Sequence, residues 1–302
     1  MKNKTILITG GTGYLGSLVV RRLLADGANV IVLKRSFSNT ARIQDLSTLI
    51  RFINIDEGGL EGIFTSCSVD TIIHCATNYG RASTKPTQLI EANLMLPLQL
   101  LQLAVQYGVR SFINTDTVLD TRVNYYALSK GHFCDWLKTF SSKIVCCNVA
   151  LEHFYGPLDD TTKFVSFIVQ EMLKSSKCIN LTPGEQKRDF VYVDDVVNAL
   201  ILITQSVESV NSGFFRFEVG SGSSVSIRDV VEKIRLLSNN RGIQVNYGAI
   251  PYRENEVMMS NVDLLPLIKL GWAPLISLDH GLNKTILADR AFLESRSSSR
   301  LD

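Results

Sequence analysis

Neither sign of charge dominates this sequence, and that balance excludes two classes of partner. The 302 residues include 31 lysines and arginines and 29 aspartates and glutamates, which gives a net charge of +2 at pH 7. So small a surplus provides no general electrostatic attraction to nucleic acid or to an anionic membrane. No apolar run reaches the length of a membrane span, and the apolar start is too short and too patterned for a signal peptide. We therefore expect a cytoplasmic protein without a nucleic-acid or membrane partner.

The cysteines lack the spacing of a metal site or a redox pair. No C-x-x-C pattern occurs among the six, which are Cys67, Cys75, Cys134, Cys146, Cys147 and Cys178. Free thiols in a reducing compartment are the simplest interpretation, and we predict no metal site. There is no internal repeat, and 45% apolar residues suffice for a large core in one or two domains.

A glycine-rich stretch follows the first apolar run. Residues 5–9 are β-rich, residues 10–16 read G-G-T-G-Y-L-G, and residues 17–26 have an amphipathic helical pattern. This order predicts a strand, a turn and a helix whose N-terminus holds a dinucleotide pyrophosphate. The glycines are spaced three and three rather than two and three, so an ordinary turn is the alternative. The predicted cofactor contacts are Gly10, Thr12, Gly13, Tyr14, Leu15 and Gly16.

The end of the second predicted strand, residues 29–33, indicates which dinucleotide binds. An acidic residue there accepts hydrogen bonds from the adenosine ribose of NAD, whereas this chain has Lys34, Arg35 and Ser36. Two cations and a hydroxyl suit a ribose 2′-phosphate, which favours NADP(H). The alternative is a solvated strand end, with NAD(H) as the cofactor.

Further strands alternate with helices along the first half of the chain. Strands are predicted at residues 51–55, 71–76 and 111–114, and a helix at residues 89–107. The alternation predicts an α/β fold of Rossmann type, a doubly wound parallel sheet with helices on both faces. His74 lies on a buried strand, where a core histidine is the expected role.

Ligands of such a sheet gather at the carboxyl ends of its strands. Asp56, which follows the third predicted strand, either contacts the amino group of the adenine or faces solvent. Further predicted cofactor contacts are Ala76, Thr77 and Asn93.

The fifth strand runs into a group of residues suited to proton transfer. Tyr126 and Lys130 are four residues apart within a predicted helix over residues 125–139, so they share a face. A neighbouring ammonium favours the phenolate, and we expect Lys130 to lower the pKa of Tyr126 toward neutrality. The Tyr126 phenol can exchange a proton with an alcohol or carbonyl oxygen of a substrate. Thr115 precedes this pair at the strand end and can donate a second hydrogen bond to that oxygen.

Together these motifs resemble the extended short-chain dehydrogenase/reductase family of nucleotide-sugar epimerases, dehydratases and reductases. The resemblance rests on the glycine stretch, on Thr115, Tyr126 and Lys130, and on four later segments. These segments are F-Y-G-P at 154–157, Q-K-R-D-F-V-Y-V-D-D at 186–195, F-E-V-G-S-G at 217–222 and L-G-W at 270–272.

The resemblance implies a division of the chain and a diphosphate site. Residues 1–151 would form the dinucleotide-binding domain, residues 152–294 a small α/β substrate cap with segments returning to the sheet, and residues 295–302 a flexible tail. Arg188 and Arg253 would hold the diphosphate of a nucleoside-diphosphate sugar. A structural salt bridge is the alternative for either. A helical pair, residues 89–107 and 125–139, would form a homodimer.

Departures from the family pattern narrow the chemistry. Sugar 4,6-dehydratases of this family have Thr-Asp-Glu where this chain has Thr115, Asp116 and Thr117, so the carboxylate base of dehydration is missing. Asp116 and Thr117 are predicted substrate contacts, with a turn role as the alternative for Asp116. His153, preceded by Glu152, replaces the family's asparagine and either contacts the substrate or packs there.

These observations predict an oxidoreductase of deoxysugar biosynthesis, such as that of a lipopolysaccharide O-antigen. We expect NADPH-dependent reduction of the C4 keto group of a nucleoside-diphosphate 4-keto-6-deoxyhexose. The short interval between residues 115 and 126 resembles bacterial CDP-3,6-dideoxyhexose synthases of the abequose or paratose type.

Three alternatives stay open. An NAD-dependent sugar 4-epimerase would recycle a tightly held cofactor. A non-enzymatic NADP sensor would usually lose the tyrosine or lysine, and both are present here. A reductase of uncharged ketones would leave two arginines without phosphate partners.

Overall fold

The computed structural model describes residues 1–81, 84–174, 176–240 and 242–298, which fall into two compact units. The first unit comprises Met1–Leu151, Val197–Val219 and Asp263–Trp272. The second unit comprises Glu152–Val196, Gly220–Val262 and the chain from Ala273 onward. The chain thus leaves the first unit at Leu151 and returns to it twice.

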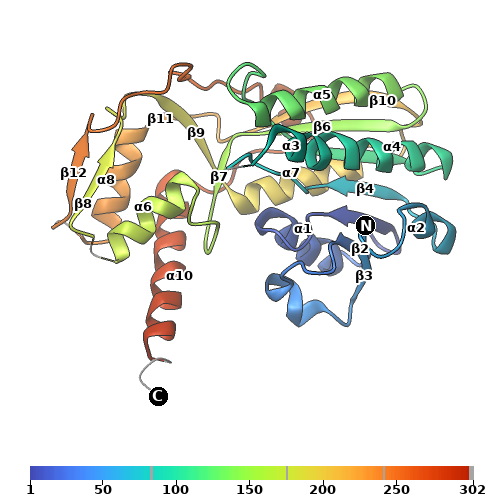
Figure 1. Ribbon diagram of the computed structural model, residues 1–302, viewed down its shortest axis with the longest axis horizontal. Helices are drawn as coiled ribbons and strands as arrows, with labels where there is room; N and C mark the ends of the chain where they lie inside the picture. The colour runs from blue at the N-terminus through green and yellow to red at the C-terminus, as the bar shows by residue number, and fades with distance from the viewer. Residues whose placement is uncertain (82–83, 175, 241, 299–302) are drawn as a thin grey trace. The chain divides into compact units, whose positions relative to one another are not determined.

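A seven-stranded parallel sheet is the centre of the first unit, in the order β10-β6-β5-β4-β1-β2-β3 (Figure 1). This order reverses between β1 and β4, which is where open α/β sheets bind their ligands. The predicted Rossmann-type fold is confirmed. The strands are β1 (Thr5–Thr9), β2 (Asn29–Lys34), β3 (Ile50–Asn54), β4 (Thr71–His74), β5 (Ser111–Thr117), β6 (Val145–Leu151) and β10 (Gly213–Val219).

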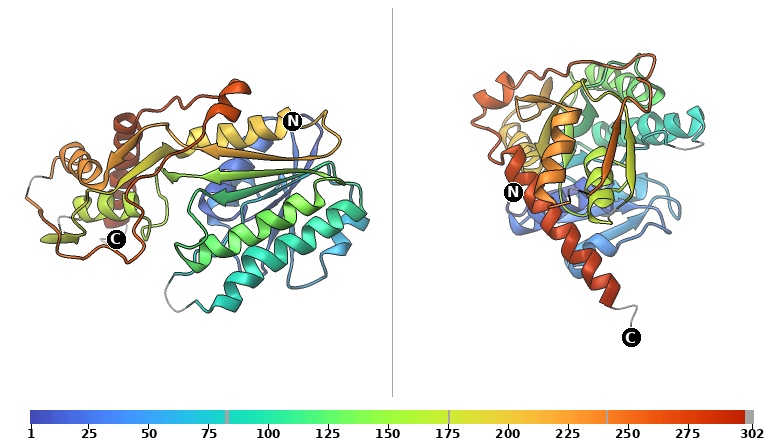
Figure 2. Two further views of the ribbon diagram at one scale, coloured as in Figure 1. Left: turned by 90° about the horizontal axis from the view of Figure 1, so that it is seen from above. Right: turned by 90° about the vertical axis from the view of Figure 1, so that its left-hand side faces the viewer.

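Helices cover both faces of this sheet, as the left view of Figure 2 shows. One face carries α4 (Leu96–Gln106) and α5 (Tyr125–Phe140), which pack on each other. On the other, α1 (Tyr14–Ala25) is joined to α7 (Val193–Ser206) by a hydrogen bond from Arg22 to Asn198. The strands are buried on both faces, which is why they read as nearly continuous apolar runs. Shorter helices of this unit are η1 (Ala41–Leu46), α2 (Glu61–Ser66) and α9 (Leu265–Lys269).

One helical stretch, Pro86–Gln106, is long and apolar enough to span a membrane when judged by length and composition alone, contrary to the expectation from the sequence. It consists of α3 (Pro86–Ile90), the π-helical turn η2 (Glu91–Met95) and α4. Leu100, Leu101 and Ala104 are fully buried in the core cluster that also contains Phe112 of β5. Packing in the core therefore explains part of the apolar character of the stretch, since about a third of its apolar window is buried.

Several boundaries differ from the sequence prediction, and three of them have a clear local reason. Helix α1 begins at Tyr14, inside the glycine stretch, because Gly13 is its N-cap. Strand β5 continues through Thr117, because Thr115 and Thr117 pair with Val149 and Leu151 of β6. The helix expected from residue 89 starts at Pro86, at a position where proline is favoured.

The described residues of the second unit form two small sheets and three helices. One sheet has the order β11 (Ser224–Ser226), β9 (Lys187–Tyr192), β7 (His153–Tyr155), and the other pairs β8 (Cys178–Leu181) with β12 (Gln244–Tyr247). Helix α10 (Leu278–Ser298) packs against α6 (Phe164–Leu173) and α8 (Ile227–Leu237). The predicted tail is helical up to Ser298, and residues 299–302 lie outside the described residues.

Gly10 allows the turn after β1 to approach the segment that follows β4, and Gly16 allows helix α1 to lie directly on that turn. Gly10 has φ +68°, and a Cβ there would lie 2.5 Å from the backbone nitrogen of Ala76. A Cβ on Gly16 would lie 2.1 Å from the carbonyl oxygen of Gly10. Backbone atoms cannot move aside cheaply, so both positions require glycine.

We expect Gly16→Ala to lower the free energy of unfolding by about 1–3 kcal/mol, the usual cost of overpacking. Gly62→Ala in helix α2 is the matched control, because nothing lies within 4 Å of its added Cβ. The control should be neutral or more stable by about 0.5–1 kcal/mol. Urea unfolding measures both, and equal stabilities would contradict the packing argument.

Candidate active site

The turn between β1 and α1 has the form of a phosphate cradle. The N–H of Gly13 donates to the Gly10 carbonyl at 2.9 Å, which closes the turn. Gly13 is the N-cap of α1 and has no side chain to accept hydrogen bonds from the first helical turn. An added Cβ on Gly13 would meet only the Gly10 oxygen, at 3.2 Å, so its other side is open to a ligand. These features fit a dinucleotide pyrophosphate.

The ends of β2 and β3 lie side by side and hold the predicted ribose-binding residues. Lys34 Nζ donates to Asn54 Oδ1 at 2.7 Å, and the guanidinium of Arg35 lies 4.7 Å from the ring centre of Phe37. Both the hydroxyl and the backbone N–H of Ser36 donate to Asp56, at 2.8 and 2.9 Å. These bonds lower the pKa of Asp56. The structure therefore brings together the predicted residues Lys34, Arg35, Ser36 and Asp56. Asp56 accepts its hydrogen bonds from Ser36.

Lys130 is almost completely buried, with 1% of its surface exposed. Within the part of the chain that the structure describes, its Nζ has no hydrogen-bond partner. Burial lowers the pKa of Lys130, whereas the nearby carboxylate of Asp116 and the thiol of Cys75 act to raise it. An ammonium group with unused donors and one compensating carboxylate suits a polar ligand such as a nicotinamide ribose.

Tyr126 does not have the lowered pKa that the sequence predicted. Burial raises the pKa of its phenol, and the neighbouring Tyr79 and Asp116 raise it further. Hydrogen bonds with Thr77 and Thr117 act in the opposite direction and are outweighed. The prediction was wrong in this respect because removal of the phenol from water penalises the phenolate more than its neighbours favour it. The phenol is therefore a protonated donor at neutral pH.

The hydroxyl groups of Thr115 and Thr117 make different contacts in the structure. Both lie on β5, on the same side of the strand. The buried hydroxyl of Thr115 donates to the carbonyl oxygen of His74 at 3.0 Å. Thr117 Oγ1 accepts from the Leu119 N–H at 3.2 Å, and Thr117 acts to lower the pKa of the Tyr126 phenol. His74 is itself a buried core residue, bonded to Thr9, as expected.

Asp116 points to the opposite side of β5 and is held inside the first unit. Its Oδ2 accepts from Asn148 Nδ2 at 2.6 Å, and its Oδ1 accepts from the Thr117 N–H at 2.8 Å. Asn148 in turn accepts from Asn114 at 2.7 Å, and all three side chains are buried. We had not selected Asn114 or Asn148 from the sequence. A polar amide in an otherwise apolar strand, as in V-C-C-N-V-A-L of β6, is the signal that identifies such a residue.

Asn93 connects the loop after β4 to helix α5. Its Oδ1 accepts from the N–H of Asn78 at 2.7 Å and from Thr77, and its Nδ2 donates to Asn78 and to Ser129. Asn93 is fully buried in the π-helical turn η2, a distortion that is frequent at functional sites. It thereby holds Thr77 beside Tyr126.

The remaining predicted residues belong to the second unit. Arg188 is buried and forms an ion pair with Glu256, while Arg253 is exposed on the same loop as Glu256. His153 follows the buried Glu152 and bonds to it through Nδ1 at 2.9 Å.

Comparisons with known proteins show the family and the fold of the chain. Residues 6–220 match the model of the NAD dependent epimerase/dehydratase family. The CDP-abequose synthase of Salmonella muenchen is 33% identical over 294 residues, which cover 94% of this chain and 97% of that protein. Among solved structures, the UDP-glucose 4-epimerase of Thermotoga maritima with UDP-glucose has a TM-score of 0.83 at 26% identity, covering 96% of this chain and 99% of that one. The Thermus thermophilus UDP-glucose 4-epimerase in complex with NAD shares the fold, with a TM-score of 0.80 at 23% identity. The alignment covers 95% of this chain and 99% of that one.

The different contacts of the two threonines predict different effects of the same substitution. Thr117→Val removes the hydroxyl beside the Tyr126 phenol, so we expect kcat to fall about 10- to 100-fold, the range for loss of one positioned donor. Thr115→Val removes only the bond to the His74 carbonyl, and kcat should fall less than about 5-fold at a cost of roughly 1 kcal/mol in stability. Steady-state rates and urea unfolding measure these values, and a larger loss of kcat for Thr115→Val would reverse the assignment.

Proposed function

Because the chain belongs to the NAD-dependent epimerase/dehydratase family and is an NAD(P)-dependent enzyme of nucleotide-sugar chemistry, we propose that it reduces the C4 keto group of a nucleoside-diphosphate 4-keto-6-deoxyhexose. CDP-4-keto-3,6-dideoxyglucose is the preferred substrate of the proposal, since a CDP-abequose synthase is 33% identical along nearly the whole chain. The observation that carries the choice of reduction is this similarity to a CDP-abequose synthase, and the raised pKa of the Tyr126 phenol is consistent with it.

The proposed mechanism assigns one task to each residue around Tyr126. A reduced dinucleotide, when bound, supplies the hydride. Tyr126 donates its proton to the substrate oxygen at C4, and Thr117 hydrogen-bonds with the phenol and orients it. Lys130, compensated by Asp116, presents its buried ammonium to the ribose side of the site. Thr115 keeps β5 bonded to β4, so it acts on the position of Thr117 rather than on the substrate.

The same residues argue against dehydration. Elimination of water needs a base beside the sugar, and the family's glutamate is replaced by Thr117. The remaining acid, Asp116, is turned into the protein and bonded to Asn148 and the Thr117 N–H. A 4-epimerase is the second candidate, supported by the likeness to the Thermotoga epimerase at 26% identity.

Turnover with added cofactor separates the two candidates. A reductase consumes NADPH in proportion to the amount of a CDP-, dTDP-, UDP- or GDP-linked 4-keto-6-deoxy sugar that is added. The loss of NADPH absorbance measures this consumption. An epimerase interconverts sugars with bound NAD and no added cofactor. Absence of NADPH consumption with every 4-keto sugar would contradict the proposed reduction.

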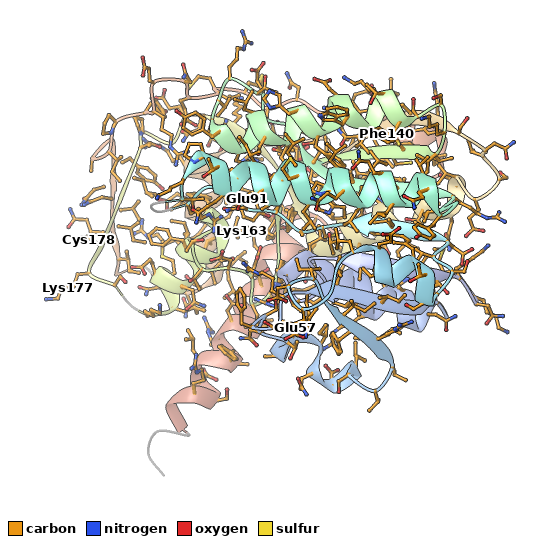
Figure 3. The ribbon with its side chains drawn as sticks, turned by 45° about the vertical axis from the view of Figure 1, so that its right-hand side comes forward. Glu57, Glu91, Phe140, Lys163, Lys177 and Cys178 are labelled. Atoms are coloured by element: carbon orange, nitrogen blue, oxygen red, sulfur yellow. The ribbon has the colours of Figure 1, made fainter. Side chains whose placement is uncertain are left out.

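We further propose a homodimer located in the cytoplasm. Figure 3 looks onto η2, α4 and α5, with Glu91 and Phe140 labelled. Large apolar side chains are exposed on α3, η2 and α5, namely Ile90, Met95, Leu128 and Trp136. Such a group on two adjacent helices is suited to a second copy of the chain, and light scattering gives the mass in solution.

The proposed preference for NADPH depends on Arg35, since Lys34 is bonded to Asn54. We expect Arg35→Ala to raise the Kd for NADPH about 10-fold or more while leaving that for NADH within about 3-fold, because only NADPH has the 2′-phosphate. Arg51→Ala, an exposed arginine on β3, is the matched control. Fluorescence titration measures both constants, and equal weakening of both cofactors would contradict a phosphate role.

A further inference from the structure

The second unit contains a fully buried carboxylate with two neutral donors. The Glu152 side chain has no exposed surface. Its Oε1 accepts a hydrogen bond from the Ser260 hydroxyl, and its Oε2 accepts from His153, from Nδ1 at 2.9 Å and from the backbone N–H at 3.3 Å. Both oxygens of Glu152 are thus engaged by residues of the same unit.

His153 is fixed along one edge and open along the other. Its ring packs against Phe190 with the ring centres 5.8 Å apart, and 38% of its side chain is exposed. Because Nδ1 donates to Glu152, the neutral ring has a bare acceptor at Nε2. His153 can donate from Nε2 only after it has taken up a second proton.

The neighbouring charges are two cations and three carboxylates. Arg188 and Asp189 lie on β9, while Arg253 and Glu256 lie on the loop that follows β12. Arg188 is paired with Glu256, and Asp189 accepts the N–H groups of Ser221 and Gly222. With Glu152 included, the cluster has one negative charge in excess, which a proton on His153 balances.

We propose that Glu152 and His153 form a proton-linked anion site, at which His153 takes up a proton when the diphosphate of a nucleotide sugar binds. Nε2–H then donates to a phosphate oxygen while Glu152 holds Nδ1–H. The proton comes from solvent, and no covalent bond of the ligand changes. The inference rests on the proposed function, because the ligand is the proposed substrate class, and it adds a coupling between binding and pH that the proposed reduction does not require.

Calorimetric titration of the full chain with CDP-glucose tests this coupling without any turnover. The diphosphate of this ligand is a diester and keeps its charge between about pH 6 and pH 8.5, the range that spans the titration of histidine. We expect about 5- to 10-fold tighter binding at the lower pH. Titrations in two buffers that differ in ionisation heat should show net proton uptake.

Three variants locate the proton. His153→Asn, which keeps a side-chain donor without a titratable group, should abolish the pH dependence. Glu152→Gln should weaken it, because the charge that compensates the imidazolium is lost. His280→Asn replaces the exposed histidine at the start of α10 and should leave the pH dependence unchanged.

The outcomes distinguish this inference from the proposed function. Binding that is independent of pH, tighter at high pH, or equally pH-dependent in His153→Asn overturns the proton-linked site and leaves the reductase proposal standing. Failure of CDP-, UDP-, dTDP- and GDP-glucose to bind the wild-type protein at either pH overturns both.

Discussion

A buried ammonium one helical turn from a partly buried phenol is the constraint on which the candidate site depends. Tyr126 and Lys130 lie one helical turn apart on α5, and Asp116 compensates the charge of Lys130. Burial favours the uncharged form of a lysine, and a nearby carboxylate opposes this effect. Burial likewise favours the uncharged form of a carboxyl group, and hydrogen-bond donors oppose it. Asn148 and the Thr117 N–H keep Asp116 in place, so the amide network inside the sheet supports the chemistry at its edge.

The same constraint bears on the proton transfer of the proposed reduction. A phenol that keeps its proton is a general acid, which suits delivery of a proton to a carbonyl oxygen during reduction. The sequence alone had suggested the opposite effect, because spacing shows that Lys130 shares a face with Tyr126 but not how far both are removed from water. Desolvation depends on all the elements packed around α5, including the loop that carries Thr77 and Tyr79.

Local patterns predicted the parallel sheet, the glycine turn and the helix of Tyr126 from the sequence, because each depends on residues close together in the chain. Contacts between distant residues were not predictable in this way. The bond of Thr115 to His74 requires the register of β4 and β5, and the ion pair of Arg188 with Glu256 joins residues 68 positions apart. The π-helical turn at Asn93 also reflects tertiary contacts, with Thr77, Asn78 and Ser129.

The pH dependence of kcat for reduction tests the central claim most directly, because at saturating substrate it reports the acid within the complex and not the binding step. A raised pKa keeps Tyr126 protonated as the pH rises, so the account predicts a constant kcat from about pH 6.5 to about pH 9. Tyr126→Phe should lower that plateau by at least about 100-fold. A kcat that falls tenfold per pH unit above neutrality, or a Tyr126→Phe variant with wild-type kcat, would contradict the account.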